Sequence, residues 1–128
     1  MIRRQNGFSL IEVVVGLVIL AIGLLAVAGM QATSVRGNFS SNNVTQATYI
    51  AQARLEFLKT LDIASANLKQ GDYDPDPFTG KVTISGMDFN PRYRVEYDLT
   101  TKLTTIIYTV SWADRVAHSI SFSTIRSQ

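Results

Sequence analysis

Cysteine is absent from the 128-residue chain and histidine occurs once, as His118. Without cysteine, the chain forms no disulfide, presents no thiol nucleophile and offers no Cys-based zinc site. A Ser–His–Asp arrangement would have to combine His118 with Asp114, which lies close by around a predicted turn, and nothing favours it over a histidine at a strand edge. We therefore expect a protein that is not an enzyme and that holds neither a metal nor another cofactor.

Glycine clusters and excess charge are also lacking. The 8 glycines are single and scattered, so no phosphate-binding loop is present. The chain has 12 Lys and Arg against 10 Asp and Glu, and Arg3 and Arg4 account for the whole formal charge of +2. Along residues 92–98 the bases alternate with acids, so no basic stripe indicates a nucleic-acid partner.

Hydrophobic residues make up 46% of the chain and are concentrated near its amino end. From Val13 to Met30 no side chain carries a charge, an amide or a hydroxyl, which is typical of a membrane-spanning helix. Arg3 and Arg4 precede this run and Arg36 follows it, so the positive-inside rule predicts a cytoplasmic amino terminus. No small-residue cleavage site follows the run, as it would in a secretory signal peptide. Glu12 costs about 2.5–3.5 kcal/mol at full membrane depth, which indicates that it has a partner.

The six residues GFSLIE at positions 7–12, followed by apolar residues 13–31, carry a resemblance to a known family. They resemble the amino terminus of type IV prepilins, in which a short basic leader ends in Gly, Phe follows, and Glu stands at the fifth position of the mature chain. That position is Glu12 here. Residues 21–31 (AIGLLAVAGMQ) are similar, more particularly, to PilV-type minor pilins.

The resemblance implies a role for each residue of the motif. Arg3 and Arg4 are the charges of the leader. A prepilin peptidase would cut between Gly7 and Phe8 and then methylate the new amine of Phe8. Glu12 would meet the Phe8 amine of a neighbouring subunit during assembly. The alternative is that the Glu12 side chain only reaches the membrane interface.

The same resemblance implies an organisation and a function. The expected parts are a leader (1–7), a transmembrane and assembly helix (8–35) and a periplasmic domain (36–128). We expect a minor pilin of a type IV pilus, anchored in the bacterial inner membrane and then incorporated with other pilins into the filament or its tip complex. The alternatives are a pseudopilin of type II secretion, and an adhesin or DNA-binding module displayed by the pilus.

Beyond the membrane run, apolar residues recur at helical spacing, which predicts that the helix continues and lies on a sheet. These residues are Val44, Ala47, Ala51, Leu55, Leu58 and Leu61. Between the two halves, residues 36–43 are poor helix formers, so we expect one long helix with a weak point there.

Four segments near the carboxyl end alternate between apolar and polar residues, which is typical of strands. They are residues 81–85, 92–99, 105–112 and 117–125. The alternation predicts that the side chains facing the core are Val82, Ile84, Tyr93, Val95, Tyr97, Leu99, Ile106, Tyr108, Val110, Trp112, Ile120 and Phe122. We therefore expect an α+β, pilin-like fold, with the long helix packed on a four-stranded antiparallel sheet.

Residues 69–80 are rich in Gly, Asp and Pro, which predicts a loop. Asp72, Asp74 and Asp76 alternate as in an EF-hand, but Pro77 stands where that loop needs Gly. We expect a solvated turn, and leave open whether this loop binds an ion.

Overall fold

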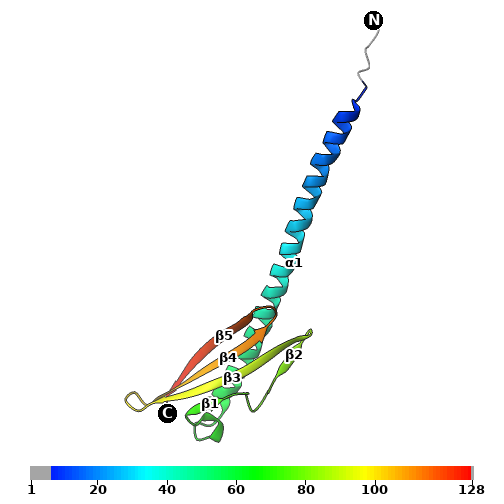
Figure 1. Ribbon diagram of the computed structural model, residues 1–128. Coiled ribbons are helices and arrows are strands. Elements are labelled where there is room, and N and C mark those ends of the chain that lie inside the picture. The colour runs from blue at the N-terminus through cyan, green and yellow to red at the C-terminus, as the bar shows by residue number, and fades with distance from the viewer. Residues whose placement is uncertain (1–6, 128) are drawn as a thin grey trace. The chain divides into compact units, whose positions relative to one another are not determined.

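The computed structural model describes residues 7–127 (Figure 1). Its one α-helix, α1, runs from Leu10–Thr60, and a short 3-10 helix, η1, spans Ala66–Leu68. Five strands follow: β1 (Gly71–Tyr73), β2 (Val82–Ile84), β3 (Met87–Asp98), β4 (Leu103–Ala113) and β5 (Ala117–Ser127). The chain divides into two compact units, Met1–Ser40 and Ser41–Gln128, which are described separately below.

The first unit contains the amino-terminal part of α1. Within this unit, all described side chains are exposed. The expected long helix is confirmed, and it continues without a break through residues 36–43. Helix formation is cooperative, so good helix formers on both sides carry the helix through this stretch of low propensity. The poor helix formers at residues 36–43 therefore do not interrupt α1.

The second unit is built around one antiparallel sheet in the order β1-β3-β4-β5, with β2 also paired to β3. The sheet thus has five strands, and the prediction of four was wrong. The additional strand, β1, lies inside the segment that was predicted to be a loop, and pairs Asp72 with Arg94. Three residues are too few to show a period, so β1 depends on its partner strand and not on a local pattern.

One face of this sheet and the second half of α1 form the core, which confirms the predicted helix-on-sheet arrangement. The buried apolar side chains are Ala47, Ala51, Leu55, Leu58, Leu68, Phe89, Tyr93, Val95, Ile106, Tyr108, Val110 and Trp112. Predicted inward side chains at the sheet's edges, such as Ile120 and Phe122, are half-buried and pack against this core.

The burial predicted for two residues, Leu99 and Val44, was wrong. Leu99 is 83% exposed because β3 ends one residue earlier, at Asp98. The Asp98 carboxylate accepts hydrogen bonds from the backbone N–H of Thr100 (2.8 Å) and from the Thr101 hydroxyl (2.8 Å), which holds the turn to β4. Val44 is 42% exposed, and the buried face of the helix begins instead at Asn43.

Candidate functional site: the amino-terminal segment

The predicted processing site lies directly before α1. Gly7, Phe8 and Ser9 precede the helix without regular secondary structure, and the Phe8 side chain is 81% exposed. Arg3 and Arg4, the predicted leader charges, lie outside the described residues. The Gly7–Phe8 peptide bond therefore lies in an exposed stretch without regular secondary structure, where a peptidase could reach it.

The fold itself does not require a glycine at position 7. A Cβ atom added at this position would find no heavy atom within 4 Å, and its backbone does not adopt the left-handed conformation that favours glycine. Nothing in the described part of the chain therefore requires glycine here. If glycine is needed at position 7, the requirement comes from a molecule that recognises this segment.

Glu12 lies in the first turn of α1. Its backbone N–H and that of Val13 donate to the carbonyl oxygen of Ser9, at 3.0 and 3.3 Å, which closes the first turn. A carboxylate at this position interacts favourably with the helix dipole. In the sequence, Glu12 is the only charged residue between Arg4 and Arg36.

The sequence interpretation missed a signal for the helix start at Ser9. Ser9 and Glu12 have the spacing of a capping box, in which a Ser before a helix and a Glu at its third position satisfy free backbone N–H groups. This Ser-x-x-Glu spacing was the available signal, and it locates the helix start that the structure has at Leu10. The hydrogen bonds that the structure shows at this start are the backbone bonds of Glu12 and Val13 to the Ser9 carbonyl oxygen.

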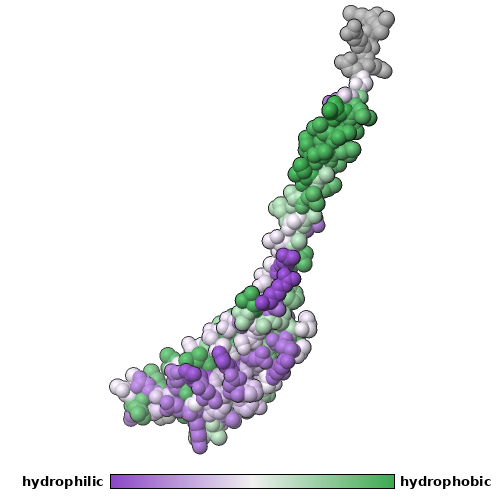
Figure 2. All heavy atoms as spheres, viewed as in Figure 1, coloured by the Kyte–Doolittle hydropathy of each residue, from purple (hydrophilic) through white to green (hydrophobic). Residues whose placement is uncertain are grey.

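The helix that follows has an apolar surface that is exposed in the described part of the chain. Figure 2 shows a continuous hydrophobic band over the first half of α1. Its large apolar side chains are at least half exposed, from Leu10 at 84% to Met30 at 74%. From Glu12 to Met30 the helix rises about 27 Å, at 1.5 Å per residue, close to the thickness of the hydrocarbon core of a bilayer. By length and composition α1 is the one described helix able to cross a membrane.

The second cluster considered from the sequence, the three acidic residues of 72–76, does not form a joint site. Asp72 pairs with the guanidinium of Arg94 (2.5 Å), and Asp74 lies 3.6 Å from that of Arg92. Asp76 is instead buried below the sheet surface. Among residues 7–127, no group of three or more His, Cys, Asp or Glu side chains is placed to hold a metal ion.

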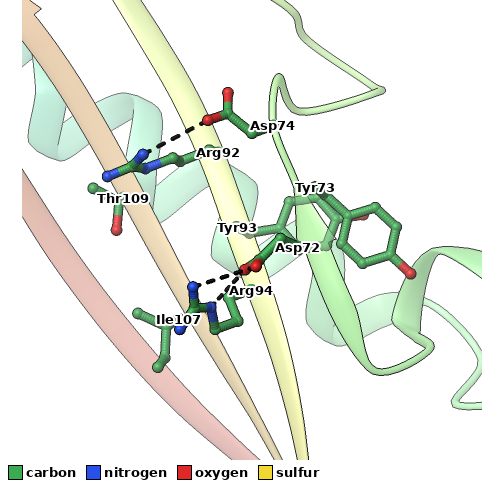
Figure 3. A pocket seen from close by; sticks show the side chains of 8 residues that line it. All are labelled: Asp72, Tyr73, Asp74, Arg92, Tyr93, Arg94, Ile107 and Thr109. Atoms are coloured by element: carbon green, nitrogen blue, oxygen red, sulfur yellow. Dashed lines mark hydrogen bonds and ion pairs between the residues drawn. The ribbon is translucent and has the colours of Figure 1, made fainter.

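The Asp72 and Asp74 pairs line an open hollow of about 380 Å³ on the sheet (Figure 3). Hydrogen bonding to Asp72 raises the pKa of Arg94. Both arginines have a carboxylate partner, so neither is available to bind an anion without breaking an ion pair. The hollow therefore gives no specific support to a ligand site.

His118 is placed as a strand-edge residue. Its Nε2 lies 3.2 Å from Asp114 Oδ1, and its ring stacks on Trp112 with a centroid distance of 5.5 Å. No described residue completes a nucleophilic arrangement with this pair, and its contacts are those of a hairpin end.

Comparison with known proteins finds a match in the amino-terminal segment. Residues 2–28 match the family model of the prokaryotic N-terminal methylation motif, and this span contains Gly7, Phe8 and Glu12. The match supports a type IV pilin-like protein that takes part in pilus or pseudopilus assembly. It implies processing by a prepilin peptidase and assembly with other pilins, and together with the apolar helix it fits a membrane-anchored pilin. No curated protein and no solved structure matches the chain.

Proposed function

We propose that the chain is a minor pilin of the PilV type, a non-enzymatic structural subunit of a type IV pilus. The observation that carries this proposal is the methylation motif at residues 2–28, placed directly at the start of a helix with an exposed apolar surface. Such a surface is unfavourable in water and has to be covered by lipid or by other helices.

Cleavage changes which of these two environments the helix prefers. Before it, the charges of Arg3 and Arg4 on one side and the polar domain on the other hold the helix across the inner membrane, with the amino terminus in the cytoplasm. After cleavage between Gly7 and Phe8, the leader charges are gone. The chain then begins with the methylated ammonium of Phe8, and Glu12 lies one helical turn beyond it.

Glu12 gives the assembled helices their register. Two unit charges about 4 Å apart attract by roughly 4 kcal/mol at an effective dielectric constant near 20, before the cost of desolvation is subtracted. The Phe8 ammonium of a neighbouring subunit is the natural partner, because the apolar run offers no other charge. A pair of this kind fixes the axial position of one helix against the next, whereas apolar contacts alone allow sliding.

Mass spectrometry of the amino-terminal peptide tests the proposal. We expect the mature chain to begin at Phe8 with one added methyl group, and Gly7→Ala to block the cut while leaving the fold unchanged. Gly37→Ala is the matched control, since this glycine is also exposed, has an open environment and lies outside the motif. An intact leader on chains recovered from filaments would contradict the assignment of Gly7.

The destination of the mature chain decides between a pilus and a secretion system. We expect the protein in filaments sheared from the cell surface, and expect deletion of its gene to reduce surface pili. Normal piliation together with a loss of secreted enzymes would instead identify a pseudopilin of type II secretion.

A further inference from the structure

The two edges of the sheet differ in how they are protected. Along one edge lie β1 and β2, which have three residues each and leave a gap between them opposite positions 90–92 of β3. Along the other edge lies β5, which is 11 residues long (Figure 1). Short, interrupted edge strands are a common protection against pairing with other chains, whereas a long regular edge strand is a template for it.

The sequence of β5 lacks the other usual protections. From Val116 to Ile125 the chain has no Lys, Arg, Asp, Glu, Pro or Gly. The pairing of β5 with β4 is continuous from Ala117 to Ser127, without a bulge. Among the described residues, no backbone hydrogen bond outside the regular elements involves β5. The free edge therefore presents regularly spaced backbone donors and acceptors.

The core is also incomplete at this edge. On β4, Tyr108 and Val110 are fully buried, both at 0% exposure. Their direct partners on β5, Phe122 and Ile120, are only half-buried. One further strand beside β5 would cover these two side chains if its own apolar residues lay on the same face. On the outer face its neighbours would be the exposed serines of β5, at positions 119, 121 and 123.

A second copy of this chain does not fit the open edge. Two β5 strands paired antiparallel are related by a two-fold axis perpendicular to the sheet, which would point α1 of the two copies in opposite directions. Two β5 strands paired in parallel about a two-fold axis would place the core face of one sheet beside the outer face of the other. Pairing with the opposite edge of a copy would use only β1 and β2, and the twist of about 20–25° between neighbouring strands would turn α1 of each copy away from that of the last. Copies that share one membrane orientation therefore leave this edge open.

The charges around β5 define the occupant further. From Arg115 to the end of the chain there is no Asp or Glu, and between Arg115 and Arg126 only His118 is titratable. The Arg126 guanidinium is engaged, since it donates to the backbone oxygens of Leu58 (3.4 Å) and Leu61 (2.8 Å). Arg115 is exposed and takes part in no ion pair among residues 7–127. The edge therefore suits a strand that is neutral along β5 and carries a carboxylate near Arg115.

We propose that β5 binds an extended segment of a different protein, which adds to the sheet as a further antiparallel strand. Its apolar side chains cover Ile120 and Phe122, and small polar side chains alternate with them on the face of Ser121. Because the segment runs opposite to β5, the carboxylate that faces Arg115 lies at its carboxyl end. In binding by strand addition, main-chain hydrogen bonds supply the affinity and the alternating side chains supply the specificity.

A peptide that copies residues 104–114, here called the β4 peptide, is a suitable probe. This sequence already pairs with β5 on the other side, places Thr109 opposite Ser121 and ends in Asp114. Labelled with fluorescein, the β4 peptide should bind the full chain in detergent micelles, as measured by fluorescence polarisation. A peptide of the same composition without the alternation should bind at least about tenfold more weakly, because its apolar side chains would lie on both faces.

Charge pairs at the centre of β5 test the register. The β4 peptide with Thr109→Lys places an ammonium opposite position 121, so it should bind a chain with Ser121→Glu about tenfold more tightly than a chain with Ser121→Lys. The same two substitutions at Thr109 of the chain are the matched control. The Thr109 and Ser121 hydroxyls are hydrogen-bonded to each other at 2.8 Å, so all four variants lose this bond. Position 109 of the chain lies two strand spacings, about 10 Å, from the peptide, so its two variants should differ by less than about twofold.

Disulfide formation distinguishes a foreign strand from a second copy. The chain has no cysteine, so Ser121→Cys introduces a single thiol. Opposed residues of antiparallel strands have Cα atoms about 4.5–5.5 Å apart, within the range that a disulfide spans. On spheroplasts of bacteria that express the full chain, mild oxidation should link Ser121→Cys to an added β4 peptide with Thr109→Cys. It should give no linked pair of chains.

Four results would overturn the proposal: no binding of the β4 peptide, equal binding of the peptide without alternation, equal charge discrimination at positions 109 and 121, or linked pairs of the Ser121→Cys chain. The last result would identify a second copy as the occupant. None of these measurements involves cleavage at Gly7, so their outcome is separate from that of the proposed function.

Discussion

Asp76 is the only buried carboxylate among the described residues, with 2% of its surface exposed. Its Oδ2 accepts hydrogen bonds from the hydroxyls of Tyr108 (2.5 Å) and Thr79 (3.3 Å), and its Oδ1 accepts one from the backbone N–H of Phe78 (2.9 Å). Its own backbone N–H donates to the carbonyl oxygen of Pro91 (3.0 Å). Burial, and next the bond to Asp76, raise the pKa of Tyr108, so this hydroxyl remains a donor at neutral pH. These bonds fasten the segment between β1 and β2 to the sheet.

Removing the Asp76 carboxylate should therefore destabilise the domain. Asp76→Ala leaves the buried Tyr108 hydroxyl and the part-buried Phe78 N–H without this partner, which should lower the free energy of unfolding by about 3 kcal/mol. Denaturant unfolding of the full chain in detergent, followed by the emission of the buried Trp112, measures this. The control is Asp74→Ala, which removes an exposed carboxylate and should change the free energy by less than about 1 kcal/mol. Equal losses in the two variants would show that Asp76 is not a structural anchor.

The role of Asp76 also shows what the sequence could not reveal at the scale of residues. Asp72, Asp74 and Asp76 alternate in the sequence, which suggests a shared site. Their partners lie on other strands, and Tyr108 is 32 positions away from Asp76. A local pattern contains no information on which of three similar side chains is turned inward, so this feature required the structure.

At the scale of elements, α1 changes its surroundings at Asn43. This is the first residue of the helix that is buried, with 3% exposure, and its Nδ2 has no hydrogen-bond partner among the described residues. Four residues later the same face continues with Ala47, which is completely buried. A polar amide thus occupies the first position of an otherwise apolar stripe.

Replacing this amide by an apolar side chain of similar size should stabilise the packing of helix on sheet. We expect Asn43→Leu to raise the free energy of unfolding by about 1 kcal/mol, because an unpaired buried amide is no longer desolvated. Thermal unfolding of the full chain in detergent reports the change. Asn42→Leu, on the exposed side of the same turn, should have little effect on stability. A loss of stability in Asn43→Leu alone would mean that the amide has a polar partner such as water.

The sequence located the alternating strands but not all of their bounds, since β3 begins at Met87, five residues before the predicted start at Arg92. Alternation over many residues correctly located β3, β4 and β5, and their inward side chains up to Tyr97. It failed at Leu99, where the capped turn at Asp98 takes precedence over hydrophobicity. Helical spacing gave the buried face from Ala47 to Leu58, but not Asn43, because no propensity rule predicts a buried amide.

At the scale of the whole molecule, the amino-terminal site is predicted from a signal that is local in the sequence. A leader charge, a glycine, an aromatic residue and a carboxylate at fixed spacing are all visible within residues 3–12. The match of residues 2–28 to the methylation motif agrees with that interpretation. The open edge of β5 could not be predicted in the same way, because it depends on the order of strands in the sheet.

The last prediction separates an assembly role of Glu12 from membrane anchoring. Glu12→Val makes the helix more apolar, so retention in the membrane should be undiminished. Cleavage after Gly7 should also persist, because the change lies beyond the cut. Incorporation into filaments should be lost, since the ammonium of a neighbouring Phe8 would be buried without a partner, which commonly costs about 3–5 kcal/mol.

Glu12→Gln is the sharper variant, because it keeps the shape and hydrogen bonding of the side chain and removes only its charge. It also preserves the capping-box spacing with Ser9, since Gln serves at the third position of a helix as Glu does. A defect in Glu12→Gln therefore reports the missing charge and not a frayed helix start. Immunoblots of sheared filaments against membrane fractions measure incorporation and retention in the same cells. We expect Glu12→Gln to be nearly as defective in incorporation as Glu12→Val, with both retained in the membrane. Normal incorporation of Glu12→Gln would show that assembly does not need the charge of Glu12, and the register of the assembled helices would then have to come from apolar packing.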